Sequence, residues 1–133
     1  MDADSTRAPD GATDLTTKND AAILAAWERF AANRKAVGEL REETPGYEAK
    51  EERLWAAVHA DEVFIGESTA KTLLGVEIQL WCIVSHDVPQ WEWELAVFRR
   101  DISAFDGLDE HLDWSTRVAL QAIRSLRAMG GEA

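Results

Sequence analysis

Charged side chains stand at or near the apolar stripes of three predicted helices, where a chemical site would need them. The set consists of Arg34, Glu51, Asp61, Glu62 and Glu77. Carboxylate oxygens are the ligands that Mg²⁺ prefers, so convergence of these side chains would create a magnesium site suited to hydrolysis. The alternative is a buried network of ion pairs that includes Arg34. The sequence favours the network, because a buried carboxylate must find a cation or take up a proton.

The longest apolar run of the chain, LLGVEIQLWCIV over residues 73–84, is the element around which the rest must pack. About 20 apolar residues are needed to cross a bilayer, so this run is too short. Its residues also alternate as in a strand, but no second alternating run is present to pair with it. We therefore expect a buried helix over about residues 72–86, with Thr72 as its N-cap.

Glu77 lies in the middle of the most apolar face of that predicted helix. At about 100° per residue, this face also holds Leu73, Leu74, Trp81 and Val84. We expect Glu77 to form an ion pair or hydrogen bond with a neighbouring helix. A functional carboxylate and a face that simply meets solvent are the open alternatives.

Apolar residues recur at helical spacing along most of the chain, which predicts an all-α, single-domain bundle of about five helices. Residues 1–19 contain almost nothing to bury and are typical of a disordered acidic tail, so the helical domain spans residues 20–131. The expected helices cover about residues 20–40, 45–66, 72–86, 87–105 and 113–129. The fourth begins with Asp87 as its cap and Pro89 in its first turn, and Gly130–Gly131 ends the fifth.

The fourth predicted helix has apolar residues on two sides, so one buried face cannot hide all of them. Trp91 begins the inward stripe, whereas Trp93 and Val97 fall on roughly the opposite side. Trp and Arg are the residues that most often anchor protein interfaces. Trp93 and Val97 therefore predict an interaction surface. The alternative is that Trp93 packs under a loop or under the tail.

The last predicted helix carries the basic patch of an acidic chain. Arg117, Arg124 and Arg127 gather on one side of it, and we assign them to the same interaction surface as Trp93. Its inward side is expected to comprise Trp114, Val118, Ala119, Ala122, Leu126 and Met129. Self-association is the expected use of such a surface, and a two-fold homodimer is the commonest form.

The charge balance narrows the class of partner. The chain has 133 residues, with 25 acidic against 14 basic side chains and a net charge of −11. This charge disfavours direct binding to nucleic acid or to an anionic membrane, and it fits a protein partner or an acidic decoy that imitates nucleic acid. The hydrophobic fraction of 46% is that of a soluble globular protein. The single Cys82 and an acidic N-terminus with no visible signal peptide predict the cytoplasm.

Catalytic signatures are absent from the sequence, which has no GxGxxG, P-loop, HExxH, CxxC or GxSxG motif. Its histidines, His59, His86 and His111, stand far apart and none belongs to a Glu-x-x-His pair, so no metal or cofactor is predicted. Helical nucleotide pyrophosphohydrolases combine Glu-x-x-Glu on one helix with Glu-x-x-Asp on the next. Glu48-Ala-Lys-Glu51 is similar to the first half, but the central helix lacks the second.

Three segments resemble those of a group of small helical bacterial proteins with no established activity. They are GVEIQLW at residues 75–81, LDW at 112–114 and AIRSLRA at 122–128, and the likeness spans about residues 20–131. The resemblance implies a bacterial cytoplasmic protein and brings no catalytic residues with it. We therefore expect a non-enzymatic protein-interaction module, an adaptor or regulator that binds a protein partner or itself. The alternatives are a magnesium-dependent hydrolase that uses the inward carboxylates and the acidic decoy.

Overall fold

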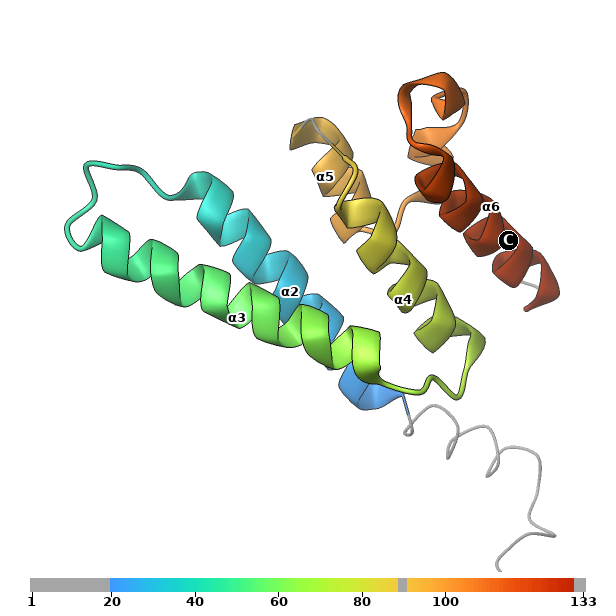
Figure 1. Ribbon diagram of the computed structural model, residues 1–133, viewed down its shortest axis with the longest axis horizontal. Coiled ribbons are helices and arrows are strands. Elements are labelled where there is room, and N and C mark those ends of the chain that lie inside the picture. The colour runs from blue at the N-terminus through green and yellow to red at the C-terminus, as the bar shows by residue number, and fades with distance from the viewer. Residues whose placement is uncertain (1–19, 89–90, 131–133) are drawn as a thin grey trace, which may run out of the picture. The chain divides into compact units, whose positions relative to one another are not determined.

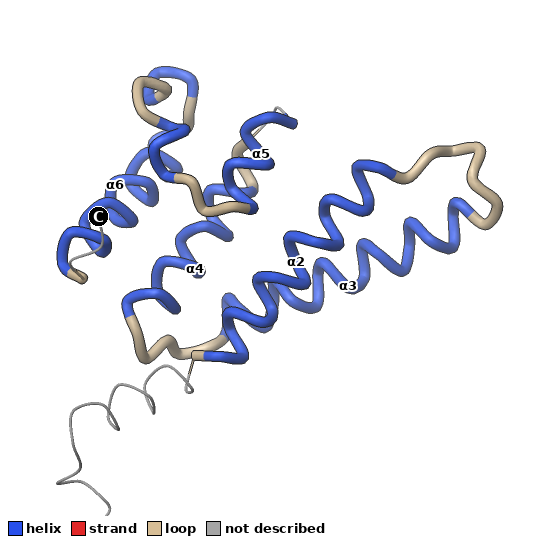
Figure 2. The backbone as a smooth tube through the Cα atoms, turned by 180° about the vertical axis from the view of Figure 1, so that it is seen from behind, coloured by secondary structure: helices blue, strands red, loops and turns tan. Residues whose placement is uncertain are grey.

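The computed structural model of the protein describes residues 20–88 and 91–130 (Figure 1). Its regular elements are α2 (Ala21–Glu39), α3 (Tyr47–Glu67), α4 (Leu73–Ser85), α5 (Trp91–Phe98), η1 (Ile102–Phe105), η2 (Asp109–His111) and α6 (Trp114–Met129). Within the described ranges every one of them is helical (Figure 2). The predicted all-α fold is confirmed, and so is the helical nature of the central apolar run. The predicted tail, Pro89 and Gly131 lie outside the described residues.

The chain divides into two compact units, of which the first ends at Gly75 and the second begins at Val76. The division falls inside α4, one turn after the helix starts. No helix in the described part of the chain has both the length and the apolarity needed to cross a bilayer.

In the first unit, α2 and α3 run antiparallel, side by side, as a helical hairpin (Figures 1 and 2). The buried residues of α2 are Ile23, Ala26, Trp27 and Phe30, whose i, i+3, i+4, i+7 spacing is that of one helix face. From α3, Val58 and Ile65 are buried seven residues apart. The turn between the helices ends at Gly46, whose φ of 72° is a left-handed conformation that glycine adopts without steric cost.

Asp20, just before α2, holds the start of α4 within the first unit. Its buried carboxylate accepts the N–H of Lys71 at 3.0 Å, the N–H of Thr72 at 2.7 Å and the hydroxyl of Thr72. Thr72 Oγ1 in turn accepts the N–H of Gly75 at 3.0 Å, which confirms Thr72 as the N-cap of α4. Asp20 makes no side-chain cap hydrogen bond to α2 itself. The Asp20 carboxylate, which precedes α2, therefore accepts hydrogen bonds from backbone amides that precede α4.

The burial of α4 begins only after this first turn. Ile78, Trp81 and Val84 are fully buried, as expected for a central helix. Leu73 and Leu74 are 43% and 38% exposed, so the prediction that they share a hidden face with Glu77 is wrong. These leucines occupy the capped first turn of α4, where the polar contacts of Asp20 and Thr72 hold the backbone.

In the second unit, the predicted helix over residues 87–105 is wrong at both ends. Asp87 lies in a turn, and its carboxylate accepts the N–H of Asp113, just before α6, at 2.9 Å. At the other end α5 stops at Phe98, and Arg100 has a φ of 53°. The N–H of Asp101 bonds the carbonyl of Ala96, and the N–H of Arg100 bonds that of Val97, both at 2.9 Å. This is the hydrogen-bond pattern of a Schellman helix end, with arginine where glycine is usual.

We expect the Arg100→Ala variant to be less stable than Arg100→Gly by about 1 kcal/mol, because only glycine adopts the left-handed conformation without a steric penalty. Both variants lose the same guanidinium group, so the comparison isolates the backbone. Urea denaturation of the two proteins measures the difference. Equal stabilities, or a more stable alanine variant, would show that Arg100 does not hold this conformation.

The buried face of α6 is rotated relative to the prediction. Its buried residues are Thr116, Ala119, Leu120 and Ile123. Trp114, Val118 and Met129 are 72%, 47% and 68% exposed, so their predicted inward orientation is wrong. The reason is electrostatic: Arg127 contacts the buried Glu77, and Ile123 lies one turn before Arg127 on the same face. With Arg127 on the buried side of α6, Trp114 must point away from the core of the second unit.

Candidate functional site

The five charged residues predicted to converge are divided between the two units of the chain. Arg34 and Asp61 lie in the α2–α3 hairpin with different partners, while Glu77 pairs with residues of the second unit. No group of three or more potential metal ligands exists among the described residues. The carboxylate constellation that a magnesium-dependent hydrolase would need is therefore not formed within residues 20–88 and 91–130.

Asp61 is buried on α3 and pairs with Arg29 of α2. Arg29 Nη2 and Nε lie 2.9 Å and 3.2 Å from Asp61 Oδ1, a two-pronged contact that ties the two helices together. The hydrogen bond and the charge of Asp61 raise the pKa of the Arg29 guanidinium above its ordinary value. The position of Arg29 falls off the apolar stripe of α2, and its side chain stays 58% exposed. The helical periodicity of α2 did not indicate that a buried carboxylate, Asp61 of α3, faces Arg29.

Arg34 lies beside two aromatic rings. Its guanidinium carbon is 5.8 Å from the ring centroid of Phe30 and 5.7 Å from that of Trp55, which are cation–π distances. Trp55 belongs to α3, so this contact joins Arg34 of α2 to the neighbouring helix. The attraction comes from the negative faces of the rings, so Arg34 links the two helices through aromatic contacts.

Glu51 and Glu62 make contacts within α3. Tyr47 donates its hydroxyl to Glu51 at 3.2 Å, and Glu62 lies 4.0 Å from His59 Nδ1. The pKa of Tyr47 is raised above its usual range, mainly by desolvation and to a smaller extent by the hydrogen bond to Glu51. Both pairs join residues three or four apart on one helix, a spacing that brings side chains together without any tertiary contact.

Glu77 is buried and makes charged hydrogen bonds to α6. Arg127 Nη2 lies 2.7 Å from Glu77 Oε2, and Arg127 Nε lies 3.0 Å from Oε1. Trp81 Nε1 donates to Oε2 at 2.9 Å, and Arg100 Nη1 lies 3.5 Å from the same oxygen. Arg127 Nη2 also donates to the Arg100 carbonyl at 2.8 Å. Glu77 thus joins α4 to α6 and to the end of α5 in one connected set of contacts.

The protonation of Glu77 reflects opposing influences. Burial by itself raises the pKa of Glu77. The hydrogen bonds from Arg127 and Trp81, together with the charges of Arg127 and Arg100, outweigh burial and lower its pKa below the ordinary value. Glu77 is therefore a charged structural residue at neutral pH. Arg127, which was assigned to the exposed basic patch, is instead committed to this cluster.

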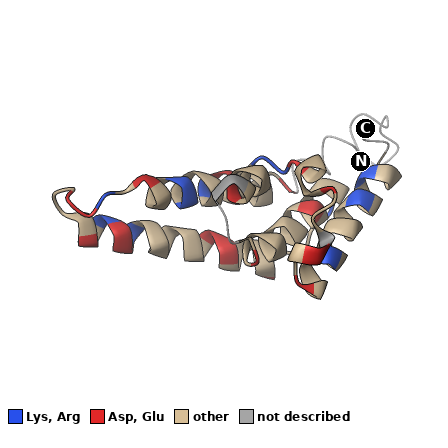
Figure 3. Cartoon of the chain, turned by 90° about the horizontal axis from the view of Figure 1, so that it is seen from above, with Lys and Arg blue, Asp and Glu red and all other residues tan. Residues whose placement is uncertain are grey.

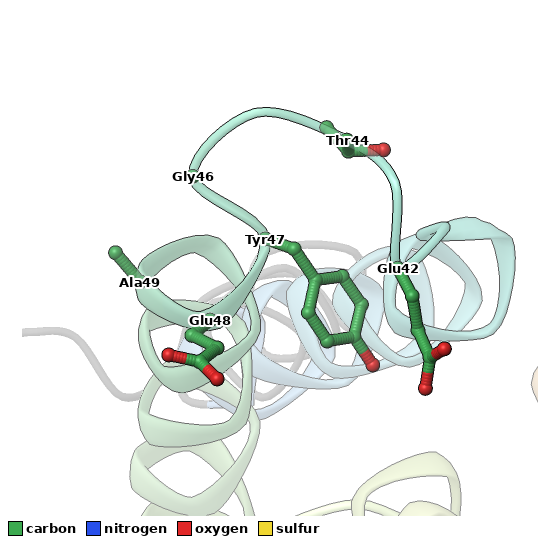
Figure 4. Close-up of a pocket in the computed structure, with 6 residues that line it drawn as sticks. All are labelled: Glu42, Thr44, Gly46, Tyr47, Glu48 and Ala49. Carbon is green, nitrogen blue, oxygen red and sulfur yellow. The ribbon is translucent and has the colours of Figure 1, made fainter.

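The turn between α2 and α3 contains an open hollow of about 590 Å³ (Figure 4). Its lining residues are Glu42, Thr44, Gly46, Tyr47, Glu48 and Ala49. In the view of Figure 4 the ring of Tyr47 lies between the carboxylates of Glu42 and Glu48. The polar side chains that line it are the carboxylates of Glu42 and Glu48, the hydroxyl of Thr44 and the phenol of Tyr47.

The predicted interaction surface is also rearranged. Val97 is 1% exposed and Trp93 is only half-buried, so Val97 cannot contact a partner. Arg124 lies 3.3 Å from Gln121 Oε1 and 3.4 Å from Asp106 Oδ1. Arg117 is exposed, and no ion pair holds it within the described ranges. Of the five residues predicted for this surface, Arg117 is exposed, and Trp93 and Arg124 are partly exposed.

A different surface is exposed on α6, and sequence reasoning missed it. It comprises Trp114, Arg117, Val118 and Gln121, all exposed, which we call the α6 outer face. At about 100° per residue these positions lie within about 60° of Trp114. The buried residues of α6 occupy the opposite side. The face could have been found from the sequence by placing Arg127, rather than Trp114, on the inward stripe.

Comparison with known proteins gives no further information on the role of this surface. No family model, no curated protein and no solved structure matches the chain.

Proposed function

We propose that the protein is a non-enzymatic interaction module, acting as an adaptor or regulator in the cytoplasm, whose α6 outer face binds an acidic amphipathic helix of a protein partner. The observation that carries the proposal is Trp114, a tryptophan 72% exposed on a helix whose opposite side is fully buried. Water contact with so large an aromatic surface is unfavourable, and an apolar partner would remove it. Trp is also the residue type most enriched among binding hot spots.

Charge supports an acidic partner. The sequence of α6 contains three arginines and no carboxylate, whereas the chain as a whole has a net charge of −11 (Figure 3). Arg117 stands beside Trp114 and Val118 on the outer face, and Arg124 lies about two turns further along. Opposite charges across an interface speed association and exclude wrong partners. A helix with an apolar stripe flanked by Glu or Asp would match both properties of this surface.

Two synthetic helical peptides test the proposal. Both carry the same apolar stripe, one flanked by glutamates and the other by lysines, and fluorescence anisotropy measures their binding. We expect the acidic peptide to bind the full chain and the basic peptide not to bind. Trp114→Ala should weaken binding of the acidic peptide by about tenfold or more, as expected for a hot-spot tryptophan.

Phe64→Ala provides a matched control, because Phe64 is also an exposed aromatic residue and lies in the first unit. It should leave the affinity for the acidic peptide unchanged. Circular dichroism verifies that both variants fold. Equal binding of the two peptides, or binding that survives Trp114→Ala, would remove the α6 outer face as the binding surface.

A further inference from the structure

We infer that the partner helix is supplied by a second copy of this chain: α3 of one copy packs on the α6 outer face of the other, and the two copies exchange this contact about a two-fold axis. The inference rests on the proposed function, because it names the partner of the same surface. The observations that support it come from α3, which combines exposed apolar groups with a negative charge.

Exposed apolar side chains of α3 have carboxylates around them. Trp55 and Val63 are 44% and 40% exposed. At about 100° per residue, Glu48, Glu52 and Val63 all lie within about 80° of Trp55 on the helix surface, and both glutamates are exposed. We call Glu48, Glu52, Trp55 and Val63 the α3 acidic face. It has the composition that the α6 outer face should select, a tryptophan and a valine flanked by negative charge.

The two helices are complementary in charge. α3 carries six carboxylates against one lysine and one arginine, whereas α6 carries three arginines and no carboxylate, of which Arg127 pairs with Glu77 and Arg117 lies on the outer face. Acidic positions follow α3 and basic positions follow α6 in Figure 3. Pairing α6 with α6, or α3 with α3, would bring like charges together, which is unfavourable. An α3–α6 contact between copies is the pairing of these helices that joins opposite charges.

Symmetry makes the exchange self-limiting. In a two-fold dimer each residue pair occurs twice, so the first copy's α3 contacts the second copy's α6 and the reverse contact forms at the same time. Both exposed apolar surfaces of each copy are then covered. The assembly closes at two copies and leaves neither face free to recruit a third.

Charge reversal at one residue of each face tests the pairing. Arg117→Glu on the α6 outer face and Glu52→Lys on the α3 acidic face should each weaken the wild-type dimer by about tenfold or more, because each places like charges in both contacts. Matched controls reverse exposed charges elsewhere: Arg99→Glu outside α6, and Glu67→Lys on α3, about 120° around the helix from Trp55. Neither control should change the dimer dissociation constant in sedimentation equilibrium.

The decisive experiment mixes the two single variants. In the mixed dimer one contact joins the wild-type Glu52 and Arg117, and the other joins Lys at position 52 with Glu at position 117, so both contacts pair opposite charges. An equimolar mixture of Arg117→Glu and Glu52→Lys should therefore dimerise near wild-type strength, although neither variant does so alone. The double variant should dimerise as well.

Each contrary result has a defined meaning. A wild-type chain that stays monomeric at millimolar concentration while still binding the acidic peptide would overturn the inference and leave the proposed function intact. A dimer that ignores both reversals would also overturn the inference, because it would use another surface. Failure of the acidic peptide to bind monomeric Glu52→Lys, whose α6 outer face is unaltered, would defeat the proposed function itself.

Discussion

Replacing Glu77 with alanine is expected to lower the free energy of unfolding by about 3–5 kcal/mol, the usual result of removing one partner from a buried ion pair. Glu77 is 6% exposed and accepts hydrogen bonds from Arg127 and Trp81. Its loss would leave both groups without their acceptor in a partly dehydrated site. Arg100, 3.5 Å away, would lose its counter-ion as well. Urea denaturation followed by circular dichroism measures the change.

Glu67→Ala serves as the matched control, because Glu67 is an exposed glutamate at the end of a helix. It should change stability by about 0.5 kcal/mol or less. If Glu77→Ala is equally mild, the cluster does not hold α4 to α6, and the rotation of α6 would need another cause.

Acid should reveal the same cluster in the wild-type chain. The pKa of Glu77 is lower in the folded state than its ordinary value of 4.5. The stability that this carboxylate contributes is therefore fully present above about pH 4.5, and it is lost as the pH falls through the lower, folded-state pKa. Glu77→Gln should show a shallower loss of stability over that acid range. An unchanged acid profile would contradict the assigned charge of Glu77.

Gly75→Ala is the second substitution with a large expected effect, a loss of about 1–3 kcal/mol from overpacking. An ideal Cβ at position 75 would lie 2.9 Å from Asp20 Cγ and 3.0 Å from Ala70 Cβ, and closer still to an Asp20 carboxylate oxygen. The Asp20 carboxylate cannot retreat freely, because it accepts hydrogen bonds from the backbone of Lys71 and Thr72. The new methyl group would therefore break the contacts that hold the start of α4.

Gly66→Ala is a comparison variant that is expected to raise the stability rather than lower it. Gly66 lies within α3, and a Cβ there would meet nothing within 4 Å. Alanine is the better helix former, so this variant should gain about 0.5–1 kcal/mol. Thermal denaturation of both variants checks the pair. If Gly75→Ala were stabilising like Gly66→Ala, the close approach of Asp20 to α4 would be refuted.

The sequence predicted those features that depend on helical periodicity. The stripe of Ile23, Trp27 and Phe30 is regular, because α2 packs along most of its length on one neighbour. The helical state of α4 and its N-cap at Thr72 also followed from local patterns. Glu77 could be recognised as a buried charge because apolar residues flank it on both sides in the chain.

Features set by tertiary partners could not be predicted in the same way. Arg29 falls off the stripe of α2 and stays largely exposed, and only the position of Asp61 on α3 gives it a partly buried ion pair. The apolar pattern of α6 fits two orientations, and the contact between Arg127 and Glu77 selects one of them. The end of α5 depends on Arg100, a residue type that rarely takes a left-handed conformation, so no turn signal marks the position.

The most direct test of the α6 outer face is fluorine NMR of the chain labelled with 5-fluorotryptophan, in which single Trp→Phe variants assign the resonances of Trp114 and Trp93. Trp114 is far more exposed than Trp93 and lies at the centre of the proposed binding surface. On titration with the acidic helical peptide, the account predicts a saturable shift of the Trp114 resonance while Trp93 stays unchanged. A shift of Trp93 with a stationary Trp114 would contradict it.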